Sequence, residues 1–148
     1  MPRKRENISD AVRAKLDEAR VARFATLDAK RGPHIVPIWF TYDGKFFYTA
    51  IDRKPKRVAA ERLARLQNIR AVPQVAILID KYNEDWTRLW YILIRGNARL
   101  IPASAFKERA SAIRRLRAKY LQYVGSMLAD DAAIIRITPE RITSWGKI

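Results

Sequence analysis

Four cationic side chains surround Pro55 in the short stretch RKPKR: Arg53, Lys54, Lys56 and Arg57. Proline suits the first position of a helix, so Lys54 is predicted to cap a helix whose first turn contains Lys56 and Arg57. Cations at this end oppose the helix dipole by roughly a few tenths of a kcal/mol each and repel one another. A bound anion would reverse these effects, because free N–H groups, dipole and cations would all face it. The stretch therefore indicates a phosphate site, with a solvated basic turn as the alternative interpretation.

The whole chain shares this excess of positive charge, with 30 Lys and Arg against 15 Asp and Glu and a formal net charge of +15. Such a balance favours an anionic partner, and nucleic acid, a membrane surface and a phosphorylated small molecule all remain open. A predicted helix over 104–123 displays six of the cations: Lys107, Arg109, Arg114, Arg115, Arg117 and Lys119. These would suffice for electrostatic nucleic-acid binding, although such a face is more often simply solvated.

Few other residues could do chemistry. The chain has no cysteine, which excludes disulfides, thiolate metal sites and thiol nucleophiles. Its single histidine, His34, leaves a Ser-His-Asp triad arithmetically possible but excludes a zinc site with several histidine ligands. We interpret His34 as a structural or exposed residue, and Asp80, Glu84 and Asp85 as turn and surface residues. No side chain is assigned a catalytic role.

The elements that would position the basic stretch begin with a short helix over 9–19, capped by Ser9 or Asp10. Alternating and aromatic-rich segments then predict a meander of three antiparallel strands at 21–28, 34–42 and 45–51. The Asp43-Gly44 pair is a hairpin signal between the last two. Pro37 has no N–H, so it favours an edge strand, a bulge or a place where another group meets the backbone.

After the basic stretch, a helix is predicted over 56–69, ending before Pro73. A second long helix runs from a Ser104 cap to about Tyr123. The remaining predicted strands cover 74–82, 88–101, 132–138 and 141–146. Gly96 is expected to mark a bulge or a bend, and Pro139-Glu140 a turn between the last two strands. Six or seven strands in hairpin order predict a mainly β protein, an antiparallel barrel with flanking helices.

At 148 residues the chain is expected to form one domain, 1–148, with a flexible basic tail at 1–8. No apolar run approaches the roughly 20 residues that a membrane span requires. The basic beginning is not followed by the apolar core of a signal peptide. We therefore expect a cytoplasmic protein.

Three segments together resemble a known family: ARVARFATLDAKRGPHIVPIWFTYDGKFFYTAIDRKPKR, PQVAILIDKYNEDWTRLWYILIRGNARLI and a late ITSWG. They are similar to the flavin/deazaflavin oxidoreductase superfamily of pyridoxamine 5'-phosphate oxidase-like split barrels, also called FMN-binding split barrels. Within it they look most like the mycobacterial-type, F-420-dependent branch. The resemblance covers about Ala19 to Trp145. It implies an antiparallel split β-barrel and a homodimer with two flavin-type sites at the subunit interface.

The resemblance also implies roles for particular positions. The strand VPIWF would lie along the cofactor ring, largely through the backbone of Pro37, Ile38 and Trp39. The end of the YTA strand and the basic stretch would hold the cofactor phosphate, through Thr49, Ala50, Lys54, Lys56 and Arg57. Residues reaching in from the second subunit would be Trp86, Arg88 and Trp145.

The implied function is hydride transfer between reduced coenzyme F-420 and a small organic electrophile such as an enone, quinone or tetrapyrrole-like compound. FMN is the alternative cofactor. Since the cofactor performs such chemistry, the lack of a catalytic side chain is no objection. Two further hypotheses remain: a basic nucleic-acid-binding barrel, and a split barrel that carries or senses the cofactor without turnover. Residues that bind the substrate phosphate in pyridoxamine-phosphate oxidases cannot be placed here, which argues against that substrate.

Overall fold

The computed structural model describes residues 8–51 and 59–148. Within these residues, seven strands form one antiparallel sheet in the order β2-β1-β5-β6-β7-β4-β3. The strands are β1 (Ala22–Asp28), β2 (Gly32–Ile38), β3 (Thr41–Tyr42), β4 (Phe47–Ala50), β5 (Gln74–Lys81), β6 (Trp90–Leu100) and β7 (Ile134–Gly146). The predicted mainly β, antiparallel barrel with flanking helices is confirmed.

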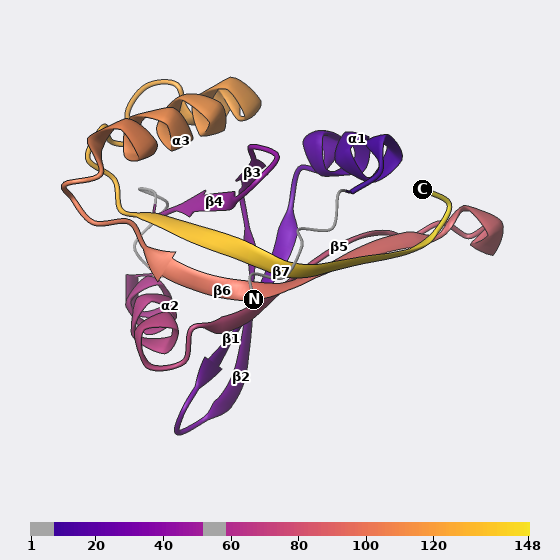
Figure 1. Cartoon of the computed structure of the whole chain (residues 1–148), viewed down its shortest axis with the longest axis horizontal. Helices are drawn as coiled ribbons and strands as arrows, with labels where there is room; N and C mark the ends of the chain where they lie inside the picture. Colours follow the sequence, from indigo (N-terminus) through magenta and orange to yellow (C-terminus); the bar gives the residue numbers. More distant parts are fainter. Residues whose placement is uncertain (1–7, 52–58) are drawn as a thin grey trace, which may run out of the picture.

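Three α-helices flank the sheet in the described part of the chain: α1 (Asp10–Glu18), α2 (Ala59–Ala71) and α3 (Phe106–Lys119). Two 3-10 turns, η2 (Trp86–Arg88) and η3 (Leu121–Tyr123), follow β5 and α3. In Figure 1, α1 and α3 lie on one side of the long β6–β7 ribbon and α2 on the other. In the described ranges, no helix is long and apolar enough to cross a membrane.

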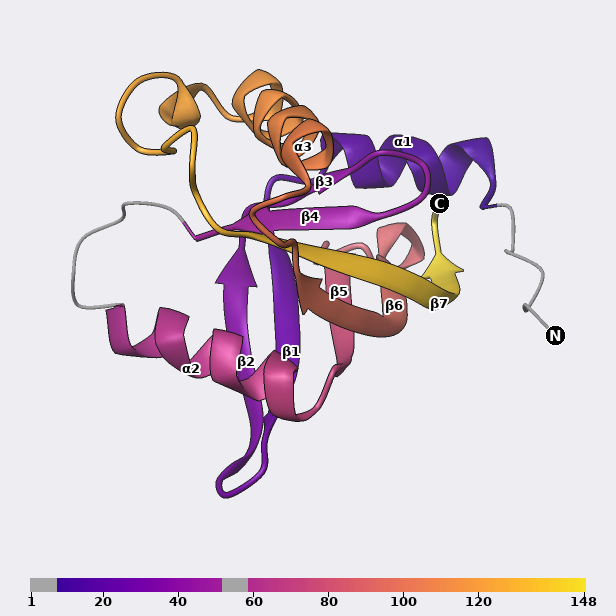
Figure 2. The same cartoon turned by 60° about the vertical axis from the view of Figure 1, so that its left-hand side comes forward.

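The barrel is split where the chain passes from β2 to β3. Only Trp39 and Phe40 separate these strands, yet the strands occupy opposite ends of the sheet order. The sheet therefore rolls until its two edges meet, and a chain crossing joins them in place of a hydrogen-bonded ladder. Figure 2 shows the β3–β4 hairpin crossing above β1 and β2. The pairings of the predicted meander, β1 with β2 and β3 with β4, are confirmed. The predicted continuous strand over 34–42 is wrong, because it breaks at Trp39 and Phe40, and β4 pairs on its other side with β7.

One buried side chain holds this crossing. The hydroxyl of Tyr120 accepts a hydrogen bond from the backbone N–H of Phe40, at 3.2 Å. The same oxygen lies 3.0 Å from the carbonyl oxygen of Arg20 and 3.2 Å from that of Phe40, to either of which it can donate. Backbone groups that lose a strand partner at the split are thus satisfied by a residue 80 positions away.

Two apolar clusters form the core. The larger fills the inside of the rolled sheet, with Phe24, Phe40, Ile77, Ile92 and Ile94 among its fully buried members. The smaller lies between the β4 side of the sheet and α3, and it includes Tyr48, Ala50, Ile113, Leu116 and Ile134. Each fully buried aliphatic or aromatic side chain contributes about 1.5–3 kcal/mol relative to exposure. The second cluster is what fixes α3 against the barrel.

The C-terminal hairpin expected at Pro139-Glu140 is wrong, since β7 is a single strand of 13 residues. Its register against β6 shifts between Arg95 and Gly96, so Glu140 opposes no residue. The predicted irregularity at Gly96 is confirmed as this bulge. A Cβ at Gly96 would overlap the carbonyl oxygen of Thr138, so the close approach of the strands requires glycine. A bulge also tolerates Pro139, which cannot donate to a regular ladder.

The predicted start of α1 and end of α2 are confirmed, and the predicted start of α3 is wrong. Ser9 caps α1 by accepting a bond from the backbone N–H of Val12 at 3.2 Å, and α2 ends before Pro73 as predicted. However, α3 begins at Phe106 without a side-chain cap, so the Ser104 cap is wrong. Its buried face contains Ala112, Ile113 and Leu116, whereas Phe106 and Ala110 are exposed. The buried face of α3 is therefore the one that packs on the smaller apolar cluster, and it does not include every apolar residue at helical spacing.

Candidate functional site

The end of β2 presents three residues in different ways. Pro37 is exposed on an edge strand, which confirms the interpretation of its missing N–H. Ile38 points into the barrel, and Trp39 is half-buried against the second cluster. Because β2 pairs only with β1 among the described strands, one row of its peptide groups faces outward along the edge. Backbone groups are therefore what this strand can offer a ligand.

The end of β4 meets this place from the other half of the barrel. Ala50 belongs to the cluster against which Trp39 packs, so the ends of β2 and β4 border the same apolar cluster. Thr49 is 2% exposed, and its hydroxyl is therefore enclosed within the chain. The predicted phosphate residues Lys54, Lys56 and Arg57 lie outside the described residues.

The three residues expected from a second subunit lie elsewhere. Trp86 is 72% exposed in η2, Arg88 makes only a long ion pair of 3.7 Å with Asp85, and Trp145 is 53% exposed. Trp145 stacks on Tyr91 with ring centroids 5.8 Å apart. It lies on β7, four strands from β2 in the sheet order. One chain does not bring these residues to the end of β2.

Exposed apolar residues lie on the outer face of β1, β2 and β5, and sequence reasoning missed them. The outward side chains of β1, β2 and β5 include Leu27, Ile35 and Leu78, and Ile35 is 64% exposed. The inward residues of the same strands, such as Phe24, Val36 and Ile77, lie in the core, and the outward face also holds the Arg23–Asp80 ion pair. Apolar residues on both faces of a strand are the signal that could have revealed this surface, since both faces are then expected to be covered.

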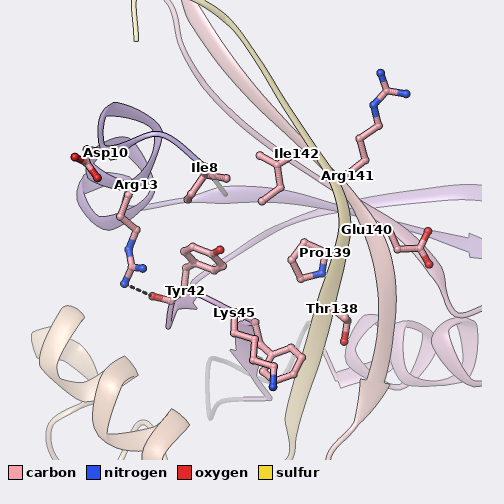
Figure 3. Close-up of a pocket in the computed structure, with 12 residues that line it drawn as sticks. Ile8, Asp10, Arg13, Tyr42, Lys45, Thr138, Pro139, Glu140, Arg141 and Ile142 are labelled. Carbon is pink, nitrogen blue, oxygen red and sulfur yellow. Dashed lines mark hydrogen bonds between the residues drawn. The ribbon is translucent and has the colours of Figure 1, made fainter. Parts of the chain in front are cut away.

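A groove of about 480 Å³ opens where the β3–β4 hairpin leaves β7. Figure 3 shows its apolar side, formed by Ile8 before α1, Tyr42 on β3, and Pro139 and Ile142 on β7. Arg13 closes one end, donating to the carbonyl oxygen of Tyr42 at 3.4 Å. The groove has the volume of a small-molecule pocket. The sequence did not reveal it, because three distant segments form it.

A half-buried polar network fastens α3 to the barrel beside the β4 strand end. Glu108 accepts hydrogen bonds from Tyr48 at 3.0 Å and from Arg136 at 2.8 and 3.1 Å. Burial, followed by the bond to Glu108, raises the pKa of Tyr48 well above its ordinary value. Tyr48 therefore stays neutral, and its hydroxyl remains a donor at physiological pH.

Lys119 is a second unusual group near the split. Its ammonium lies 3.9 Å from the ring centroid of Phe40 and donates to the carbonyl oxygen of Leu16 at 3.2 Å. Burial, with repulsion from Arg20, lowers the pKa of Lys119 to about 8. This cation contacts the β2–β3 crossing from the α1 side.

The acidic residues of the β5–β6 connection are confirmed as surface and turn residues. Asp80 pairs with Arg23 at 3.0 Å, and Asp85 accepts from the backbone N–H of Thr87 at 3.0 Å. His34 is half-buried near the start of β2. Across the described residues, no group of three potential metal ligands gathers.

The fold recurs in solved structures. A FAD-binding protein from Mesorhizobium loti is 18% identical, with a TM-score of 0.65 over 93% of this chain and 94% of that one. The heme storage protein HutZ from Vibrio cholerae is 16% identical, with a TM-score of 0.70 over 95% of each chain. An F420 reductase is 19% identical, with a TM-score of 0.64 over 92% of this chain and 98% of that one. At these identities the likeness shows the shared fold alone.

Two comparisons with known sequences bear on the family of this chain. The chain matches none of the curated proteins. The model of the family described as pyridoxamine 5'-phosphate oxidase matches residues 8–146, and it thereby supports the resemblance noted in the sequence. Because this match extends over nearly the whole chain and the rolled, split sheet agrees with it, the protein belongs to the pyridoxamine 5'-phosphate oxidase family of split barrels.

Proposed function

We propose that the protein is a homodimeric oxidoreductase that uses a flavin-type cofactor, with coenzyme F-420 preferred and FMN as the alternative. One observation carries the proposal: Trp39 at the end of β2 and Ala50 at the end of β4 pack in one cluster. In the sequence the cationic stretch begins at Arg53, three residues after Ala50, which is a chain span of about 10 Å when extended. A planar ring and a phosphate joined to it would find complementary groups within that span.

The described residues fit such a cofactor. Those backbone N–H and C=O groups of Pro37, Ile38 and Trp39 that face outward, with no N–H from Pro37, would hydrogen-bond the polar edge of a flavin-type ring. We assign the phosphate to Lys54, Lys56 and Arg57, and only the backbone of Thr49 and Ala50 to the site, because the Thr49 hydroxyl is enclosed. When bound, the cofactor supplies hydride transfer. The protein then needs to orient the ring, exclude water and neutralise the phosphate, which requires no nucleophile.

The exposed apolar residues on the outer face of β1, β2 and β5 favour a second copy of the chain as part of the site. Leu27, Ile35 and Leu78 would be covered by it, which removes apolar surface from water. We assign Trp86, Arg88 and Trp145 to the ring at the β2 edge of that copy, since three strands separate β7 from β2 in the sheet order of their own chain. These three residues remain proposed contacts.

The test is a titration of the purified protein with F-420 and with FMN, followed by cofactor fluorescence at two salt concentrations. Lys56→Ala with Arg57→Ala should reduce cofactor affinity at least about tenfold, since each lost charge-assisted phosphate bond is worth about 1.5–3 kcal/mol. Arg114→Ala with Arg115→Ala removes the same charge from α3 and should leave affinity unchanged. Equal losses in both double variants would refute the assigned phosphate site. A reduction assay then distinguishes an enzyme from a carrier.

A nucleic-acid-binding function is the second candidate, favoured by Lys107, Arg114 and Arg115. All three are exposed on α3 and make no ion pair with a described residue. This function predicts a steep fall of affinity with salt. It also predicts that the α3 double variant, and not the Lys56 and Arg57 variant, weakens binding of a DNA or RNA duplex.

A further inference from the structure

Two arginines face each other on the outer side of the sheet. Arg95 on β6 is directly opposite Arg141 on β7, and both are exposed. Neither makes a hydrogen bond or ion pair with any described residue. Like charges placed directly opposite across a sheet are destabilising. A bound anion between the two side chains would relieve this repulsion.

The β-bulge determines which residue of β7 lies opposite Arg95. Gly96 is opposite Pro139, so a regular antiparallel ladder would continue with Arg95 opposite Glu140 and form an attractive ion pair. The bulge instead leaves Glu140 unopposed, where it accepts a hydrogen bond from Asn97, and brings Arg141 opposite Arg95. The strand pair thus replaces an available Arg–Glu pair by an Arg–Arg pair.

The two guanidinium groups flank a hollow of about 230 Å³, whose other lining residues are Leu93 and Thr143. The hydroxyl of Thr143 makes only a long bond of 3.4 Å to the carbonyl oxygen of Leu93, so it can turn toward a ligand at little cost. Two arginine forks and a hydroxyl are the donor set that suits a phosphate or carboxylate.

We propose that this hollow binds the oxyanion of a small molecule, a phosphate or a carboxylate, between Arg95 and Arg141. The site is separate from the proposed cofactor phosphate site. Arg141 lies seven residues along β7 from Ile134, the partner of Ala50, which is about 23 Å at 3.3 Å per residue. The stacked Tyr91–Trp145 pair lies four residues from Arg95, or about 13 Å, and does not line the hollow.

Inorganic phosphate and pyrophosphate are the probes. We would measure thermal unfolding and isothermal titration at constant ionic strength, with chloride as the matched salt, for three proteins: wild type, Arg141→Glu and the control Arg114→Glu. Ligand binding to the native state raises the unfolding temperature. The wild type and Arg114→Glu should show a rise with pyrophosphate, and Arg141→Glu should lose it, with at least a tenfold weaker affinity.

The same variants test the repulsion directly. Without phosphate, Arg141→Glu should unfold at the same temperature as wild type or a higher one, because the new carboxylate faces Arg95. An equal phosphate response in both variants would overturn the site, since it would show non-specific screening. Sedimentation that finds altered self-association in Arg141→Glu, with no phosphate response in wild type, would also overturn it and assign the pair to contact between copies. F-420 and FMN titrations of Arg141→Glu separate this outcome from failure of the proposed function.

Discussion

Removal of the Tyr120 hydroxyl is the sharpest test of how the split barrel is held. In Tyr120→Phe the ring keeps its packing against Tyr123 and Arg20, and only the oxygen is lost. The buried backbone N–H of Phe40 then has no acceptor among the described residues. The carbonyl oxygens of Phe40 and Arg20 lose the hydroxyl that donates to them. The substitution therefore isolates the cost of leaving the crossing unsatisfied.

The expected loss of stability follows from the number of groups affected. A buried donor left unsatisfied costs about 1–3 kcal/mol, and a lost hydrogen bond about 0.5–1.5 kcal/mol. We expect the free energy of unfolding to fall by about 2–3 kcal/mol. For a chain of this length the unfolding temperature should fall by about 5–10 °C, at roughly 2–4 °C per kcal/mol.

Urea unfolding followed by tryptophan fluorescence measures this loss. The matched control is Tyr82→Phe, which removes an exposed hydroxyl whose bond to Glu84 at 3.2 Å water can replace. The control should change the free energy of unfolding by less than about 0.5 kcal/mol. If Tyr120→Phe also changes it by less than that, the hydroxyl does not hold the crossing and the reasoning is refuted.

Three further predictions concern α3 and the outer face. Glu108→Gln should lower the free energy of unfolding by about 1–3 kcal/mol, because half-buried Arg136 loses its charged partner. The control Asp17→Asn, at an exposed ion pair, should change it by less than about 0.5 kcal/mol. Equal effects of the two substitutions in urea unfolding would contradict a stabilising role of the Glu108 network. Lys119 has a depressed pKa of about 8 against 10.5 unfolded, so the unfolded chain binds more protons between these values and stability should rise with pH there. In Lys119→Met this rise should be smaller, and an unchanged profile would rule out Lys119 as its source. Ile35→Glu should dissociate the proposed dimer in gel filtration with the monomer still folded, and an intact dimer would place the interface elsewhere.

Local sequence patterns predicted the elements well where a short stretch contains its own signal. Ser9 precedes an apolar helical repeat, and the structure shows its cap. Asp43-Gly44 is the hairpin turn, in which Asp43 accepts bonds from the backbone N–H groups of Lys45 and Phe46. Such features depend on atoms a few residues apart, so composition and spacing suffice to predict them.

The site could be predicted only in part. The sequence indicated an edge strand as one of three interpretations of Pro37, and the family resemblance identified the β2 end, but neither showed that Trp39 and Ala50 border one apolar cluster. The pairing of Tyr48 and Arg136 with Glu108 was equally hidden, because the partners come from three separate elements. Charge and hydrogen-bond partners of this kind depend on how the elements are packed.

By itself, the sequence determined the mainly β class, the family, the cationic stretch around Pro55 and most element positions. Only the tertiary structure decided that the chain crosses the barrel at Trp39 and Phe40, and that a bulge brings Arg141 opposite Arg95. The physical reason is the separation along the chain of the residues that interact. Period and capping arise within a turn or a strand, whereas register and closure depend on contacts such as Tyr120 with Phe40, which form only when the whole core packs.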